Sequence, residues 1–130
     1  EANSNISAIV EAAARVGDRL DIYSGNDDQI VPILSVGGKG VISVLSNVVP
    51  KRTVEMCRRY FDGDVEGSAA IQFELLPLVN ALFCETNPIP VKAAMAAMGF
   101  CENYLRLPLV PMSKDKEAKM LDIMKGLGVL

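Results

Sequence analysis

The 130-residue sequence contains no histidine. This absence excludes Ser-His-Asp catalysis, Cys-His catalysis and imidazole zinc sites within the chain. Cysteine is also scarce, and Cys57, Cys84 and Cys101 lack the C-x-x-C spacing of zinc and redox motifs. We therefore expect reduced, mostly buried thiols in a cytoplasmic protein, and we expect neither a metal nor a cofactor.

Positive charge is in short supply. The 13 lysines and arginines are outnumbered by 16 acidic residues, which gives a net charge of −3. Without a basic stripe to displace counterions, nucleic-acid binding is excluded. No apolar run reaches the roughly 18 to 20 residues of a membrane-spanning helix, so we expect no membrane span.

Apolar residues are abundant instead. Half of the residues are hydrophobic and 22% are charged, against about 25% charged in an average soluble domain, and mean hydropathy is +0.26. We expect this surplus to cover protein–protein contacts. The chain is then either a piece of a larger fold or part of a homodimer or larger assembly.

Periodicity predicts two helix–strand pairs in the first third of the chain. Apolar residues at helical spacing predict a helix over 4–16, ended by Gly17. A strand follows over 20–24, and a second helix runs over 26–36 to Gly37-Gly38. The β-branched segment 41–45 predicts a second strand, buried on both faces.

The rest of the sequence predicts helices only, over about 50–62, 64–83, 87–98 and 113–126. The first of these should turn Val54, Cys57, Tyr60 and Phe61 inward. In the second, the apolar stripe comprises Leu75, Leu76, Val79, Leu82 and Phe83. We also expect Cys84 and Cys101 to lie in the core.

Two strands joined by a helix imply a parallel pair with a right-handed crossover. Such a pair is not stable alone, because each strand exposes an edge and a face. A closed barrel of eight strands needs about 250 residues. The local pattern therefore predicts an incomplete α/β fold.

Ser24-Gly25-Asn26-Asp27-Asp28 follows a strand and opens a helix. In a parallel barrel this position lies on the face where active sites gather. A simpler alternative is that Gly25 turns the chain while Asn26 or Asp28 caps the helix. The adjacent aspartates are better explained by the helix dipole than as paired catalytic carboxylates.

Two lysines could be mistaken for functional groups. Lys39 lies in a Gly37-Gly38-Lys39-Gly40 run that precedes a strand and lacks the order of a phosphate loop. Lys92 stands among small apolar residues, like a desolvated Schiff-base amine, but it lies inside a helix. We expect it to be an ordinary helix lysine with its ammonium in water.

Five segments, in order, resemble the C-terminal half of dihydrodipicolinate synthase, over essentially the whole chain. They are Glu1-Ala2, Ser24 to Asp28, Gly38 to Val44, Asn87 to Lys92, and Leu105-Arg106-Leu107-Pro108-Leu109. The resemblance implies the C-terminal part of a (β/α)8 barrel, with the last β/α units in residues 1–48. The final barrel helix and a C-terminal helical region would occupy residues 49–130.

The family is a class I aldolase that condenses pyruvate with aspartate semialdehyde in lysine biosynthesis. The resemblance implies that Gly25 and the backbone of Ile42 contact pyruvate. Many relatives carry aspartate where this chain has Asn26. The family's Schiff-base lysine would stand immediately before Glu1, so no catalytic residue is assigned and the isolated chain is expected to be inactive.

Two alternatives remain open. In the first, the chain is a fragment of N-acetylneuraminate lyase or of another keto-acid aldolase. In the second, it is a non-catalytic truncated relative. The latter would act as a self-associating helical module.

Overall fold

The computed structural model describes residues 2–130 in two compact units. The first unit extends to Ser43 and includes Lys51–Glu74, and the second comprises Val44–Pro50 and Leu75–Leu130. Glu1, one of the two residues of the Glu-Ala match, lies outside the described residues.

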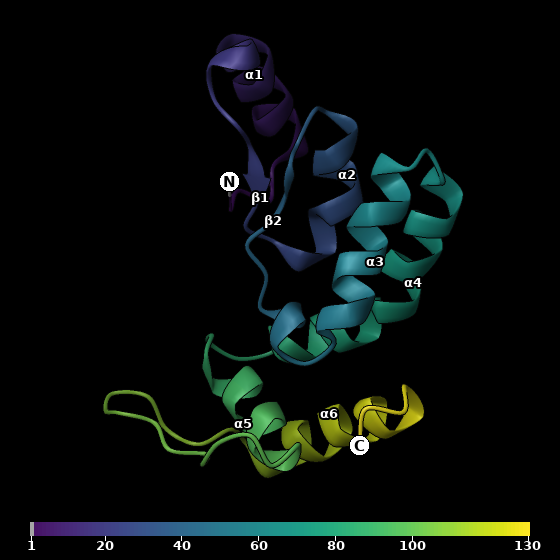
Figure 1. The fold of residues 1–130 in the computed structure, drawn as a ribbon. Coiled ribbons are helices and arrows are strands. Elements are labelled where there is room, and N and C mark those ends of the chain that lie inside the picture. Colours follow the sequence, from purple (N-terminus) through teal and green to yellow (C-terminus); the bar gives the residue numbers. More distant parts are fainter. Residues whose placement is uncertain (1) are drawn as a thin grey trace. The chain divides into compact units, whose positions relative to one another are not determined.

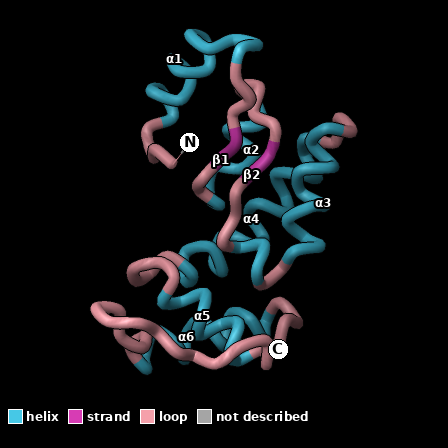
Figure 2. Tube along the Cα trace, turned by 60° about the vertical axis from the view of Figure 1, so that its left-hand side comes forward, coloured by secondary structure: helices cyan, strands magenta, loops and turns pink. Residues whose placement is uncertain are grey.

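The first unit carries both strands. Its elements are α1 (Ile6–Val16), β1 (Tyr23–Ser24), α2 (Ile30–Ser35) and β2 (Gly40–Val41), with 3-10 turns at Gly17–Arg19 and Asp27–Gln29. The strands lie side by side and parallel (Figure 2), as predicted, with Ser24 opposite Val41.

The ends of α1 follow the sequence signals. The Asn5 side chain accepts a hydrogen bond from the Ala8 amide at 3.2 Å, which satisfies one free donor of the first turn. At the other end Gly17 has φ +50°, a conformation that favours glycine.

The second strand is shorter than the predicted segment 41–45. β2 ends at Val41, and a 3-10 turn occupies Leu45–Asn47. Burial of this strand on both faces was also a wrong prediction, because the Ile42 side chain, just beyond the strand, is 73% exposed. The sheet of the described residues has two strands, too few to cover that side chain.

Helix α3 (Pro50–Phe61) presents a different face from the one predicted. Thr53 and Met56 are buried, whereas Val54 is 66% and Phe61 56% exposed. The orientation is fixed by Ser68, whose buried hydroxyl donates to the Met56 carbonyl at 2.8 Å.

Helix α4 (Val65–Leu82) begins as the sequence indicates and contains Pro77. The Asp64 carboxylate accepts from the Gly67 amide at 2.9 Å. Leu75, Val79 and Leu82 of the predicted stripe are buried. Phe83 is 42% exposed, because the helix ends one residue before it.

The second unit is helical, with α5 (Ile89–Ala97) packed against α6 (Lys114–Gly126) (Figure 1). Its core is formed by apolar side chains of α4, α5 and α6: Leu78, Leu82, Ala93, Ala94, Met120 and Met124. Pro88 occupies the N-cap of α5, so the helix begins two residues after the predicted start at 87.

The cysteines are free thiols, but they are less buried than predicted. Cys84 and Cys101 are exposed and Cys57 is half-buried. The reason is their position. Cys84 follows the end of α4, and Cys101 lies in the loop between α5 and α6. Within residues 2–130, no helix combines the length and the apolarity needed to cross a membrane.

Candidate functional site

The candidate site lies where β1 and β2 end. The Ile42 amide donates to the Ser24 carbonyl oxygen at 2.8 Å, just beyond the paired residues of the two strands. Gly25 follows Ser24 directly, so the two positions that the sequence singled out, Gly25 and Ile42, come together on neighbouring backbones. In parallel α/β folds, ligands bind at this end of the strands.

The loop after β1 is a tight, internally bonded turn. Ser24 is fully buried, and its hydroxyl donates to the Asn26 carbonyl at 2.8 Å. The same oxygen accepts from the Asn26 amide at 3.2 Å. Asn26 occupies the N-cap of the following 3-10 turn without a capping bond from its side chain. A turn held by the Ser24 hydroxyl presents Gly25 in a fixed place.

Helix α4 reinforces this turn through Gln72, which is 5% exposed. The Gln72 side-chain amide donates to the Asp27 carbonyl at 2.8 Å, and its oxygen accepts from the Val31 amide at 3.2 Å. Sequence reasoning missed this residue. The available signal was a lone amide in the otherwise apolar stretch from Ala69 to Phe73.

The adjacent aspartates do not form a catalytic pair. Asp27 is 1% exposed, whereas Asp28 is exposed, so the two side chains point in different directions. No group of three or more metal-ligating side chains occurs among the described residues 2–130. Asp27 and Asp28 are therefore two separate residues in the first turn of a helical segment.

Ile42 can meet a ligand through one backbone group. Its amide is already used by Ser24, and a residue carries one backbone donor and one acceptor. A contact from this peptide to a ligand therefore comes from the carbonyl oxygen. The site can position a substrate, and in the part of the chain that the structure describes neither strand-end loop carries a lysine.

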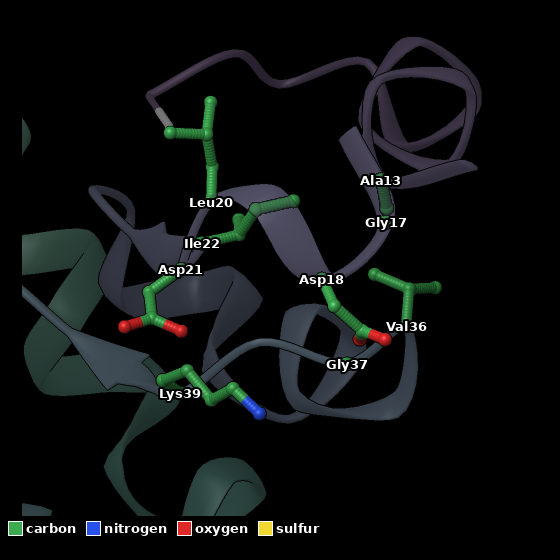
Figure 3. Close-up of a pocket in the computed structure, with 9 residues that line it drawn as sticks. All are labelled: Ala13, Gly17, Asp18, Leu20, Asp21, Ile22, Val36, Gly37 and Lys39. Atoms are coloured by element: carbon green, nitrogen blue, oxygen red, sulfur yellow. The ribbon is translucent and has the colours of Figure 1, made fainter. Parts of the chain in front are cut away.

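The lysines lie elsewhere. Lys39 precedes β2 and borders a cavity of about 350 Å³ at the opposite, amino ends of the strands. Figure 3 shows Asp18, Asp21 and Lys39 around this cavity. Lys92 lies on α5, in the second unit.

A Lys-Glu-Ala triplet occurs at Lys116, on α6 rather than on a strand. The Lys116 ammonium donates to the Cys84 carbonyl at 3.2 Å and pairs with Glu85 at 3.3 Å. These contacts give Lys116 a structural role in the second unit.

Comparison with known proteins places this geometry in context. Residues 1–127 match the family described as "Dihydrodipicolinate synthetase family". The chain is 48% identical over 130 residues to 4-hydroxy-tetrahydrodipicolinate synthase of Alkaliphilus oremlandii, covering 100% of this chain and 45% of that protein. Against the Clostridium tetani enzyme, identity is 54% over 115 residues, covering 88% of this chain and 39% of that protein.

Solved structures that carry the same family name superpose closely on this chain. Dihydrodipicolinate synthase of Thermotoga maritima superposes with a TM-score of 0.97 at 47% identity, covering all of this chain and 45% of that one. A monomeric dihydrodipicolinate synthase variant gives 0.97 at 48% identity, covering 100% and 44%. The chain therefore spans less than half the length of these relatives, and the prediction of an incomplete α/β barrel is confirmed.

Proposed function

Because the chain belongs to the dihydrodipicolinate synthetase family, we propose that it forms the C-terminal part of a Schiff-base aldolase. The intact enzyme condenses pyruvate with aspartate semialdehyde in lysine biosynthesis. The proposal places residues 1–48 in the last β/α units of the barrel. Residues 49–130 form the final barrel helix and the C-terminal helical region, in a cytoplasmic enzyme.

The observation that carries the proposal is the Ser24–Ile42 hydrogen bond. It sets Gly25 beside Ile42 at the strand ends, as expected for one wall of a pyruvate pocket. Gly25 offers backbone without a side chain, so a small keto acid can approach closely. The Ile42 carbonyl supplies an acceptor for a protonated group of the ligand.

The reaction needs a lysine amine that attacks the pyruvate carbonyl and expels water, giving an imine. Loss of a methyl proton then gives the enamine that attacks the aldehyde. Among the described residues 2–130, no lysine stands at the carboxyl end of β1 or β2. The isolated chain should therefore not form the imine.

Borohydride reduction with labelled pyruvate tests this proposal. The isolated chain should stay unlabelled. A chimera should become labelled when the rest of the Alkaliphilus oremlandii enzyme, outside its match to this chain, is joined to it. Label on the isolated chain, at any lysine, would refute the assignment, and so would an unlabelled chimera that is folded.

Exposed apolar side chains favour the second candidate, a non-catalytic module that self-associates. They occur in both units, and examples are Leu20, Val54, Phe73, Phe100, Tyr104 and Leu107. Under this alternative the isolated chain is a dimer or larger assembly and the folded chimera gains no activity. Sedimentation and the pyruvate label together separate the two functions.

A further inference from the structure

The side chain of Gln29 joins the strand-end turn to the segment that precedes α1. Its amide group donates to the Ser4 carbonyl oxygen at 3.3 Å, across 25 positions of the sequence. Both residues belong to the first unit. Gln29 therefore ties the backbone between Ala2 and α1 to the turn that carries Gly25.

The Gln29 side chain does not serve its own helix. Gln29 occupies the N-cap position of α2, where a polar side chain commonly satisfies a free amide of the first turn. Within residues 2–130 its side chain makes no capping bond to α2. The side chain is used for Ser4 instead.

Packing alone does not explain an amide at this place. Gln29 is 9% exposed, and its side-chain oxygen is a buried acceptor with no hydrogen-bond partner among residues 2–130. A buried acceptor that is left unsatisfied destabilises a fold. Because an apolar side chain of the same length would avoid this cost, the useful part of the Gln29 amide is its donor to Ser4.

The turn from which Gln29 reaches Ser4 is anchored on helix α4. The Gln72 side chain bonds the Asp27 carbonyl and the Val31 amide, on either side of Gln29 in the sequence. The backbone that carries Gln29 is thus restrained at both ends. A side chain that extends from such a backbone fixes where its partner Ser4 lies.

The segment around Ser4 has local order of its own. The Asn5 amide donates to the Asn3 side chain at 2.9 Å, and the Asn5 side chain caps α1. These two bonds lie within the segment and its helix, so they do not hold the segment to the strand-end turn. The bond from Gln29 does.

We propose that Gln29 is a positioning residue for the Schiff-base lysine. The inference rests on the proposed function, which puts that lysine immediately before Glu1, within a few residues of Ser4. Through Ser4, the Gln29 amide sets the distance between the lysine amine and the pyruvate wall at Gly25.

The step that depends on this distance is imine formation. The amine forms a bond to the keto carbon of pyruvate, and the keto oxygen leaves as water with both amine protons. A small misplacement of the amine slows this step even when the substrate still binds. Loss of the Gln29 donor should therefore lower the rate rather than the affinity for pyruvate.

The test measures the rate of imine formation in the chimera with the rest of the Alkaliphilus oremlandii enzyme. Samples mixed with labelled pyruvate are quenched with borohydride over time, at several pyruvate concentrations. Gln29→Met keeps the length of the side chain but removes the donor to Ser4. We expect the rate at saturating pyruvate to fall by about tenfold or more, with the half-saturating concentration nearly unchanged.

Ser35→Ala is the matched control. The Ser35 hydroxyl is exposed and donates to the Pro32 carbonyl at 2.7 Å in the same unit, so this variant also loses one bond from a side chain to a carbonyl. It should keep the full rate. Equal slowing by Ser35→Ala and Gln29→Met would overturn the proposal. So would an unchanged rate in Gln29→Met, or a raised half-saturating concentration without a fall in rate.

Amide hydrogen exchange of the folded chimeras gives a readout that does not depend on the chemistry. Without the bond from Gln29, the segment should open more often, and the amides of Asn5 and Ala8 should exchange faster in Gln29→Met. Ser35→Ala should exchange there like the original chimera. Unchanged exchange in Gln29→Met would contradict the tie to Ser4 and overturn the positioning role.

The outcomes separate this inference from the proposed function. A folded original chimera that forms no imine would remove the aldolase assignment together with the role of Gln29. Imine formation at the same rate with and without Gln29→Met would keep the aldolase assignment and overturn the positioning role alone.

Discussion

The Ile42 amide and the Ser24 carbonyl oxygen are joined by a 2.8 Å hydrogen bond, although helix α2 separates the two residues in sequence. This bond consumes the donor of Ile42 and leaves its carbonyl as the backbone group available to a substrate. It also sets the Gly25 backbone beside that carbonyl. The predictions for the site follow from this division of roles.

At the strand ends, backbone rather than side chain should matter for substrate binding. In the chimera, Gly25→Val should raise the pyruvate KM by about tenfold or more, because displacement of a bound substrate is costly. Ile42→Ala should leave the pyruvate KM almost unchanged, since the proposed contact comes from the backbone carbonyl, which the substitution keeps. Steady-state kinetics with varied pyruvate measures both.

Circular dichroism of each variant shows that the fold is retained. If Ile42→Ala raised KM as much as Gly25→Val, the side chain would be part of the pocket and the backbone assignment would be wrong.

Local signals predicted most of the first unit. Glycines, caps and apolar spacing identified α1, β1 and α2 to within a few residues, because each of these features acts on the backbone nearby. Gly25 and Ile42, in contrast, were singled out by the family resemblance, and their contact with pyruvate stays a prediction.

Local sequence signals did not predict the long-range packing. The inward face of α3 depends on Ser68 reaching the Met56 carbonyl, a contact that no local period encodes. The anchoring of the strand-end turn by Gln72 joins residues 45 positions apart. The exposed cysteines were mispredicted because cysteine is usually buried, whereas here two of them lie in loops.

Gln72 should be the polar side chain on which the strand-end turn depends. Gln72→Leu keeps the size but removes both hydrogen bonds, leaving the buried Asp27 carbonyl and Val31 amide without this partner. Leaving such groups unsatisfied costs about 1–3 kcal/mol each. We expect the free energy of unfolding, measured by urea denaturation, to fall by at least the lower of these values.

Asn80→Leu is the control, because Asn80 is exposed on the same helix. It should leave the urea midpoint nearly unchanged. Equal loss in both variants would show a general effect of leucine on α4 and would contradict the anchoring role.

An ion-pair network on α3 should make stability fall in acid. Hydrogen bonds from Arg52 and Arg59 lower the pKa of Glu55, which pairs with them at 2.7 Å and 2.9 Å. The Gly67 amide, and then Arg59, lower the pKa of Asp64. A depressed native pKa means that the unfolded state binds more protons in acid.

The contribution of these carboxylates is therefore present above the ordinary glutamate value of 4.5 and is lost as pH falls through the native pKa. Glu55→Gln should flatten the decline of the urea midpoint below that pH, and added salt should reduce the difference. Glu102→Gln, in an exposed loop, should keep the full decline. An unchanged acid slope in Glu55→Gln would contradict the prediction.

The three thiols should differ in reactivity, which gives a direct readout of native packing. Burial raises the pKa of the Cys57 thiol, and the thiolate is the reactive form. Cys84 and Cys101 are exposed. In the native chain at neutral pH, a thiol reagent such as Ellman's reagent should therefore react quickly with two groups and slowly with a third. In urea all three should react at similar rates. Cys57→Ser should remove the slow phase and leave the fast phase unchanged. Loss of the slow phase in Cys84→Ser or Cys101→Ser would show that Cys57 is not the buried thiol.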